Sequence, residues 1–346
     1  MAYPKLEFFR FSLKHKSKNA KTFRDFMLET NKCNNSDTDE VIFSKLYEYF
    51  MVKLKMDFAM NDQQKKCITL IQNPVGRTIN KYWDLRPQSQ NDRCIISGVL
   101  NGGTYGKERI LTNILDKHEV DSLLYNQPVL QYYYIFAYFP IDSTEGFFMV
   151  HTDSAQESIS NFMRKYVSDL FKQGDFLKPE MVIYAPKAIQ DKFREDAHIT
   201  SLSFKTTMVG DRFEENDPIK NELSEYDVSI IIKPKKDKNI SMTFAERFRA
   251  YFMPKMFGTR ENPHTLEQFE DCRLSAKNEE MKSTTIFKWN TKEAEFAPVV
   301  YLTDEMIRFN EDGTPDFVSL AEFCNELFLN IVLPELRIEN NVERVD

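Results

Sequence analysis

Residues 131–139 read QYYYIFAYF, and residues 146–151, after a turn at 140–145, read GFFMVH. Nearly every position of the first segment is apolar or aromatic, which is typical of a strand that is buried on both faces. The turn opens on Pro140 and is followed by Gly146, and both residue types interrupt regular structure. We therefore expect the two segments to form an antiparallel hairpin at the centre of a sheet.

Helix and strand patterns surround this hairpin. Apolar spacings of three and four predict amphipathic helices over residues 20–30, 41–55, 154–172, 187–196, 243–253 and 316–333. Strands are predicted at 5–13, 93–100, 104–114, 181–184, 199–208, 228–232, 274–277, 284–289 and 297–302, with a hairpin turn at Gly102-Gly103. Because no regular βαβ repeat is present, the predicted class is α+β, with mainly antiparallel sheets, flanking amphipathic helices and two to three subdomains.

The order of these elements predicts three domains. An N-terminal α+β domain with a basic turn covers residues 1–125, and a central domain of β-hairpin and helix covers 126–227. Residues 211–227 hold seven acidic residues against two basic ones, which is typical of a linker. A C-terminal domain, with a basic turn at a strand end and a closing helix, covers 228–346.

The composition is that of a folded protein from a reducing compartment. Of the 346 residues, 42% are hydrophobic and 29% are charged, which excludes global disorder. The five cysteines are widely spaced and form no C-x-x-C pair, so neither a disulfide framework nor a structural zinc site is predicted. The N-terminus has no apolar signal core, and the longest apolar stretch is about half of a membrane helix, so we expect a soluble cytoplasmic protein.

A search for catalytic patterns gives only weak candidates. The sequence has no Walker A, Rossmann glycine, H-E-x-x-H or G-x-S-x-G pattern. Asp142 and Glu145 share a turn, but no E-x-K motif of a restriction-type nuclease follows them. Asp153 could orient the imidazole of His151, although a strand-end structural role is the simpler interpretation. We predict no catalytic residue, metal or cofactor, and an enzyme remains open because a site assembled across the fold would escape this search.

The net charge of −7 hides two strongly basic segments. Residues 1–24 hold seven basic residues against one acidic, and residues 230–260 hold eight against two, so each segment carries a local charge of +6. Residues 301–346 hold eleven acidic residues against three basic ones. Local potential decides the attraction of phosphate, because charges beyond about 10 Å are screened at 0.1 M salt.

Both basic segments predict contact with nucleic-acid phosphates. In each, a strand leads into a lysine-rich turn that is followed by a helix, and lysines offer point charges rather than base-reading forks. Arg247 and Arg249 would add a bidentate grip on phosphate. The predicted DNA-binding residues are Lys14, Lys16, Lys18, Lys233, Lys235, Lys236, Lys238, Arg247 and Arg249.

Residues 226–236, YDVSIIIKPKK, place an acidic residue and an Ile/Val strand before Lys-Pro-Lys. This pattern resembles a segment of the RexA-like phage-exclusion proteins. Two further stretches are similar: residues 14–19, KHKSKN, between a strand and a helix, and residues 273–278, RLSAKN, before a polar strand, residues 297–298 and the closing helix. More distantly, the plan resembles the DNA-binding subunit of the Kiwa anti-phage system.

The resemblance implies a cytosolic homodimer that binds the phosphate backbone of double-stranded DNA and senses phage infection, with a phage protein as a further partner. It also implies signalling to a membrane-embedded effector, which is an abortive-infection type of antiviral defence. The chain departs from the pattern in its net acidity and in a longer middle region, residues 100–200. Two alternatives stay open: a metal-dependent nuclease of a defence system, and a protein-binding adaptor that contacts no nucleic acid.

Overall fold

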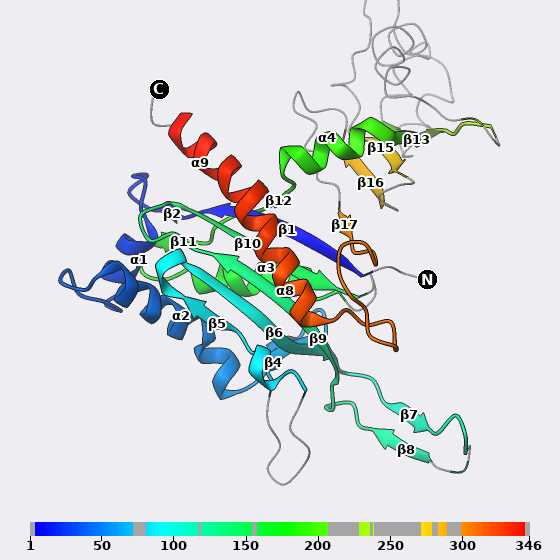
Figure 1. Ribbon diagram of the computed structural model, residues 1–346, viewed down its shortest axis with the longest axis horizontal. Helices are drawn as coiled ribbons and strands as arrows, with labels where there is room; N and C mark the ends of the chain where they lie inside the picture. Colours follow the sequence, from blue (N-terminus) through cyan, green and yellow to red (C-terminus); the bar gives the residue numbers. More distant parts are fainter. Residues whose placement is uncertain are drawn as a thin grey trace, which may run out of the picture. The chain divides into compact units, whose positions relative to one another are not determined.

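The computed structural model describes residues 4–71, 81–116, 118, 120–153, 158–206, 228–235, 238, 271–278, 283–288 and 299–342 (Figure 1). The chain forms two compact units. Unit 1 comprises Met1–Tyr184 and Tyr301–Asp346, and unit 2 comprises Ala185–Val300. The predicted boundary at residue 125 therefore falls inside unit 1 and the one at residue 227 inside unit 2, while the closing helix joins the N-terminal half of the chain.

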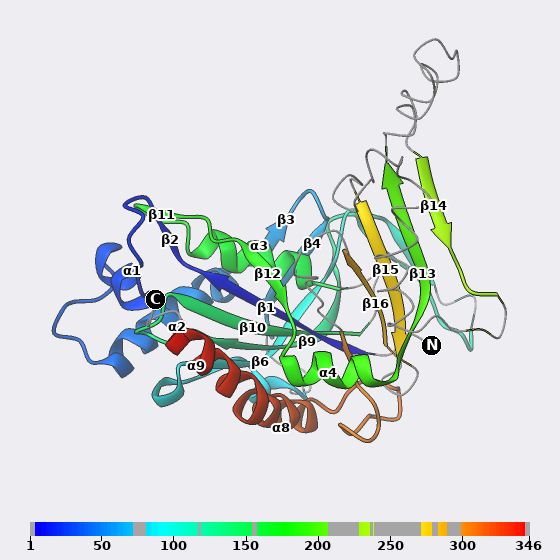
Figure 2. The same ribbon diagram turned by 90° about the horizontal axis from the view of Figure 1, so that it is seen from above.

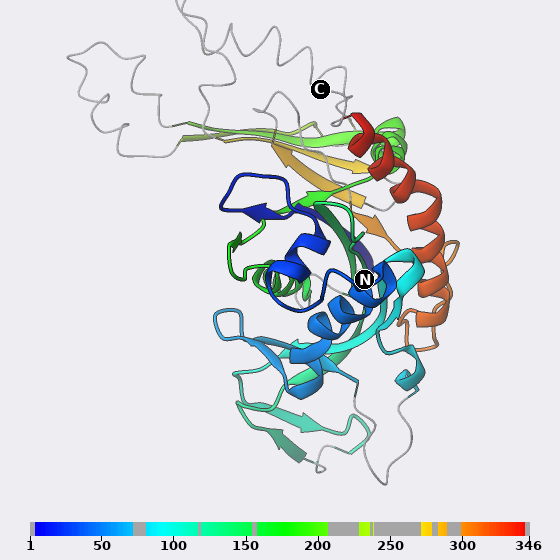
Figure 3. The same cartoon turned by 90° about the vertical axis from the view of Figure 1, so that its left-hand side faces the viewer.

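The described part of unit 1 contains a nine-stranded sheet that curls toward one of its faces (Figure 3). Seven strands follow in the order β12 (Met181–Tyr184), β1 (Lys5–Ser12), β10 (Glu145–Thr152), β9 (Val129–Tyr138), β6 (Ile95–Thr104), β4 (Lys66–Leu70) and β3 (Ala59–Asn61). Beside this path, β5 (Gln88–Gln90) pairs with β6, and β17 (Val300–Tyr301), where the chain re-enters unit 1, pairs with β1. The seven strands pair antiparallel, and the predicted α+β class is confirmed.

The hairpin predicted from residues 131–151 is β9–β10, in the middle of this sheet. Phe147 lies opposite Tyr138 across the hairpin, and Ile95 of β6 lies opposite Tyr138 on its other side. Residues 133–137 are all buried, as expected for a strand that is paired on both edges and covered on both faces.

The predicted turn at Gly102-Gly103 is wrong, because both glycines lie inside β6 and pair with β4 and β9. A Cβ at Gly103 would lie 1.8 Å from the carbonyl oxygen of Val129, and one at Gly102 would lie 3.1 Å from the ring of Tyr133. Close approach of the neighbouring strand, rather than a turn, therefore requires glycine here.

Three helices cover the inner face of the curl: α1 (Phe23–Glu29), α2 (Asp39–Met56) and α3 (Ser160–Leu170) (Figure 3). Thr22 begins α1 with a capping box, since its side chain accepts from the Asp25 N–H and its own N–H donates to the Asp25 carboxylate. Buried phenylalanines fill the space beneath the helices. Their ring centroids lie 5.2–5.5 Å from the Phe171 ring, and they are Phe11, Phe23, Phe26 and Phe139.

The outer face of the same sheet is covered by α8 (Phe317–Leu327), the π-helical turn η6 (Phe328–Val332) and α9 (Leu333–Val342) (Figure 1). Asp316 caps α8 by accepting from the N–H groups of Val318 and Ser319. Phe328 is fully buried, with its ring centroid 4.9 Å from those of Phe136 and Tyr138. By length and composition, residues 317–337 form one helix that could cross a membrane among those described, a test that core helices of soluble proteins also pass.

Smaller elements project from unit 1. β7 (Arg109–Thr112) and β8 (Val120–Leu123) form a separate two-stranded hairpin, and β2 (Lys14–His15) pairs with β11 (Phe176–Leu177). Two 3₁₀ turns, η1 (Trp83–Leu85) and η2 (Asn91–Arg93), flank β5.

In unit 2, α4 (Lys187–Asp196) precedes a four-stranded antiparallel sheet (Figure 2). The strand order is β14 (Val228–Ile232), β13 (Ala197–Thr206), β15 (Asp271–Asn278) and β16 (Ser283–Lys288). Ile189 and Phe193 of α4 are buried, as are Ile199, Leu202 and Ala276 of the sheet. The acidic stretch at 211–227 and the helix expected at 243–253 lie outside the described residues.

Candidate nucleic-acid interface

The N-terminal basic turn connects β1 to α1 and has a defined backbone. β2 pairs with β11 through His15 opposite Phe176 and Lys14 opposite Leu177. The N–H of Lys18 donates to the carbonyl oxygen of His15 at 3.1 Å, and Lys18 itself has a φ of 60° in the left-handed region. The sequence thus folds these lysines into a tight turn at the edge of unit 1.

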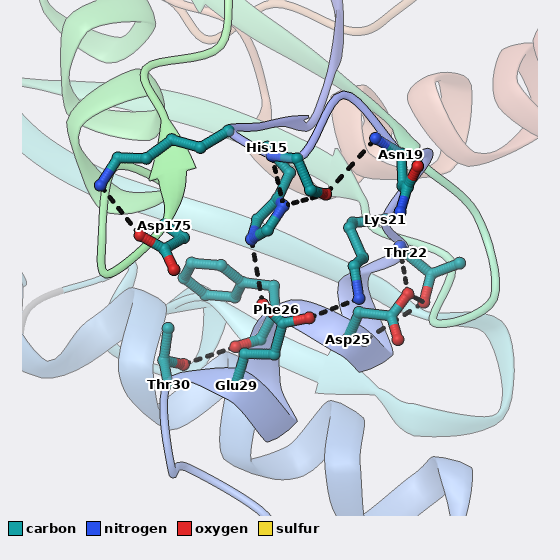
Figure 4. Close-up of polar contacts among 11 residues, drawn as sticks. His15, Asn19, Lys21, Thr22, Asp25, Phe26, Glu29, Thr30 and Asp175 are labelled. Carbon is teal, nitrogen blue, oxygen red and sulfur yellow. Dashed lines mark hydrogen bonds and ion pairs between the residues drawn. The ribbon is translucent and has the colours of Figure 1, made fainter.

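Acidic side chains from a distant segment pair with the lysines of this turn. Lys16 Nζ donates to Asp175 Oδ1 at 2.9 Å (Figure 4), and Lys14 Nζ donates to Glu180 Oε2 at 3.3 Å. The hydrogen bond from Lys16 lowers the pKa of the Asp175 carboxyl. Because both pairs are exposed they add little to stability, but each carboxylate reduces the local positive potential.

Glu29, the last residue of α1, lies between two further basic side chains (Figure 4). His15 Nε2 lies 3.2 Å from Glu29 Oε2, and Lys21 Nζ lies 2.6 Å from Glu29 Oε1. The hydrogen bond to Glu29 raises the pKa of the Lys21 ammonium. His15 also has its Nδ1 2.7 Å from Ser17 Oγ, so the imidazole is fixed on both sides.

Arginines of the same segment occupy the two carboxylates considered for a nuclease centre. Arg24 donates to Asp142 Oδ1 at 3.0 Å and to Asp39 Oδ1 at 2.5 Å, and these bonds raise the pKa of its guanidinium. Arg10 binds Glu145 Oε2 at 2.6 Å. Asp142 and Glu145 therefore bind different arginines, and the described residues contain no group of three or more His, Cys, Asp or Glu side chains that could hold a metal ion.

Within the described part of the chain, six of the seven basic residues of 1–24 have a carboxylate within ion-pair distance. The seventh, Lys18, is exposed and forms no salt bridge there. The charge of +6 counted along the sequence is thus largely matched in space. Sequence reasoning missed this because the partners are remote, as Lys14 and Glu180 are 166 positions apart.

The second predicted segment differs. β14 ends at Ile232, and the exposed lysines Lys233, Lys235 and Lys238 follow directly. The N–H of Lys238 donates to the carbonyl oxygen of Lys235 at 3.0 Å, which closes a turn at the strand end. None of the three lysines forms a salt bridge with another described residue. Lys236, Arg247 and Arg249 lie outside the described residues.

Strand register brings another basic position to this end of the unit 2 sheet. Ile232 lies opposite Leu202, so the chain beyond β14 runs toward the start of β13, where His198 lies opposite Lys277 of β15. Lys277 is half-buried and was not among the predicted site residues. The alternation of Arg273, Ser275 and Lys277 along one strand could have indicated it.

The two faces of the sheet differ at this end. The buried, fully apolar positions Ile199 and Ala276 are register partners, and α4 packs on β15. Ser201 and Ser275 are the next register pair and are half-buried. Burial therefore fixes which face turns inward, and the lysines are left on a strand end that is accessible to a ligand.

No family model matches the sequence, and no curated protein matches it.

Proposed function

We propose that the protein binds double-stranded DNA through its phosphate backbone, without sequence preference, and that the basic strand end of unit 2 is the principal contact. The observation that carries the proposal is the contrast between the two basic segments. Lys233, Lys235 and Lys238 are exposed and lack an acidic partner among the described residues, whereas the N-terminal cations face carboxylates. Unmatched lysines retain their full attraction for phosphate and release counterions on binding.

The N-terminal turn has a secondary place in this proposal. Lys18 is available there, and the exposed pairs of Lys14 and Lys16 can exchange a carboxylate for a phosphate at small cost. Its contribution to affinity should be smaller, because each exchanged lysine leaves an unneutralised carboxylate close to the DNA.

Fluorescence anisotropy with a labelled duplex of mixed sequence, titrated over a range of salt concentrations, tests the proposal. Each phosphate contact contributes about −0.9 to the slope of log affinity against log salt, so the variant Lys233→Gln/Lys235→Gln/Lys238→Gln should lose about 2.7 of that slope. The matched control, Lys14→Gln/Lys16→Gln/Lys18→Gln, also removes three lysines and should lose clearly less. A salt-independent affinity, or no retention even at low salt, contradicts the proposal and favours the adaptor.

The biological role we propose is that of a sensor in anti-phage defence that signals to a membrane-embedded partner. The support is the resemblance carried by residues 226–236, whose strand is β14 and whose lysines form the proposed contact. Cells that express the gene with its neighbouring genes should survive phage challenge, and the triple Lys→Gln variant of unit 2 should remove protection at equal protein level. Unchanged protection by that variant would separate defence from DNA binding.

A further inference from the structure

A cavity of about 240 Å³ lies on the outer face of the unit 1 sheet, where α8 begins. Its walls come from the start of β9, the end of β10, the turn at 312–317 and residues 81–82. The turn is held by its own hydrogen bonds: Asp312 accepts from Thr314, and the Asn310 side chain donates to the carbonyl oxygens of Thr314 and Pro315. These walls therefore do not depend on a ligand for their shape.

His151, the penultimate residue of β10, lies at the inner end of this cavity. Its side chain is 1% exposed, with Leu6 of β1 as a register partner and the Phe317 ring 5.6 Å away. Neither Nδ1 nor Nε2 has a hydrogen-bond partner among the described residues. A buried donor or acceptor without a partner costs about 1–3 kcal/mol, so a cavity next to both ring nitrogens indicates a polar ligand rather than a packing residue.

Aromatic rings form the apolar wall of the cavity. Tyr82 lies 4.6 Å from Tyr132 and 4.9 Å from Phe317 between ring centroids, at interplanar angles of 73° and 89°. Tyr82 and Phe317 are 7% and 3% exposed. Such a wall favours a flat, polarisable ligand, because base–aromatic contacts are worth about 1–3 kcal/mol each.

The size and charge of the site narrow the ligand further. A cavity of about 150 Å³ is enough for benzene, so this one has room for a fused two-ring heterocycle. Two carboxylates, Asp153 and Asp312, and one ammonium, Lys81, also line it. An excess of carboxylate disfavours a phosphate group, whereas carboxylates accept hydrogen bonds from the hydroxyls of a ribose.

From these observations we propose that the cavity binds a free purine nucleoside, with the base between His151 and the aromatic wall and the ribose toward Asp153 and Asp312. Purines carry both donors and acceptors on their edges, so they can satisfy either tautomer of a neutral imidazole. This site is in unit 1 and is independent of the proposed DNA contact in unit 2, so either proposal can fail without the other.

Binding of adenosine and guanosine to the full chain, by saturation-transfer NMR and calorimetry, tests the proposal. Wild-type protein should bind at least one nucleoside and should bind the corresponding 5′-monophosphate more weakly. His151→Phe keeps the ring volume but removes both nitrogens, and should weaken binding about 10-fold; His151→Gln retains a donor and an acceptor and should lose less. The matched control His118→Phe changes an exposed histidine and should leave the affinity unchanged.

Nuclear Overhauser contacts between the base protons and the rings of His151 and Phe317 in the wild-type protein give a readout that needs no variant. Their presence supports the proposal even if His151→Phe fails to fold. Absence of binding by either nucleoside, equal affinity in His151→Phe and wild type, or tighter binding of choline than of both nucleosides would overturn it. Choline is the relevant competitor because aromatic rings with carboxylates also suit a quaternary ammonium.

Discussion

Stability should fall in mild acid because of one side chain, His151. Its imidazole is fully buried in an apolar setting, and this burial lowers its pKa from 6.5 to about 3. In the unfolded chain it takes up a proton below about pH 6.5, while in the folded protein it stays neutral down to about pH 3. The unfolded state therefore binds more protons between these values, and the free energy of unfolding is full above the higher pKa and decreases as the pH falls.

The size of the effect follows from the two pKa values. At about pH 5 the unfolded state gains roughly 2 kcal/mol from protonation of this histidine, and at about pH 4 roughly 3 kcal/mol. His151→Gln removes the titration while keeping a polar side chain at the position. The difference in free energy of unfolding between wild type and variant should therefore change by about 2 kcal/mol between pH 7.5 and pH 5, with wild type losing more.

Urea unfolding followed by far-UV circular dichroism at several pH values measures this difference. His118→Gln, on an exposed histidine, should run parallel to wild type over the whole range. All other groups titrate equally in wild type and variant, so they cancel. If the curves of wild type and His151→Gln are also parallel from pH 7.5 to pH 5, then the imidazole is not buried in the way described, and the reasoning is refuted.

Three other outcomes are expected. Phe328→Ala should lower the free energy of unfolding by about 3–5 kcal/mol in urea titrations, because it leaves a cavity beneath η6, while Val318→Ala on the exposed side of α8 should cost about 0.5 kcal/mol or less. Gly103→Ala should cost about 3 kcal/mol or more, since the added methyl group meets the neighbouring strand, and an unchanged urea midpoint would contradict its placement inside β6. Lys16→Ala should raise the pKa of Asp175 toward its usual value in a carboxyl NMR titration, and a constant pKa would show that the two residues are not paired in solution.

Local patterns predicted most of the elements correctly. The aromatic run at 131–139 became β9 because an unbroken apolar segment is soluble only when neighbours cover both faces. The helical spacing at 41–55 and 316–333 became α2 and α8, whose apolar sides are buried on opposite faces of one sheet. These predictions depend on the period of a single segment, which is fixed by backbone geometry.

Features that depend on distant segments were not predictable in the same way. Gly102-Gly103 has the composition of a turn, and only the approach of Val129 shows why glycine is needed inside a strand. The same holds for the cavity beside His151, since its walls come from four separate parts of the chain. Side chains that meet across the fold carry no fixed spacing in the sequence.

The sequence by itself determined the class of fold, the amphipathic faces and the presence of two basic segments. Only the tertiary structure decided which of those charges are matched, because Asp175 and Glu180 come from beyond α3 to Lys16 and Lys14, while Lys233 and Lys235 end a strand without such partners among the described residues. Chain connectivity sets local periodicity, but electrostatic potential depends on distances in space, and these are fixed only when the sheet pairs and the helices pack.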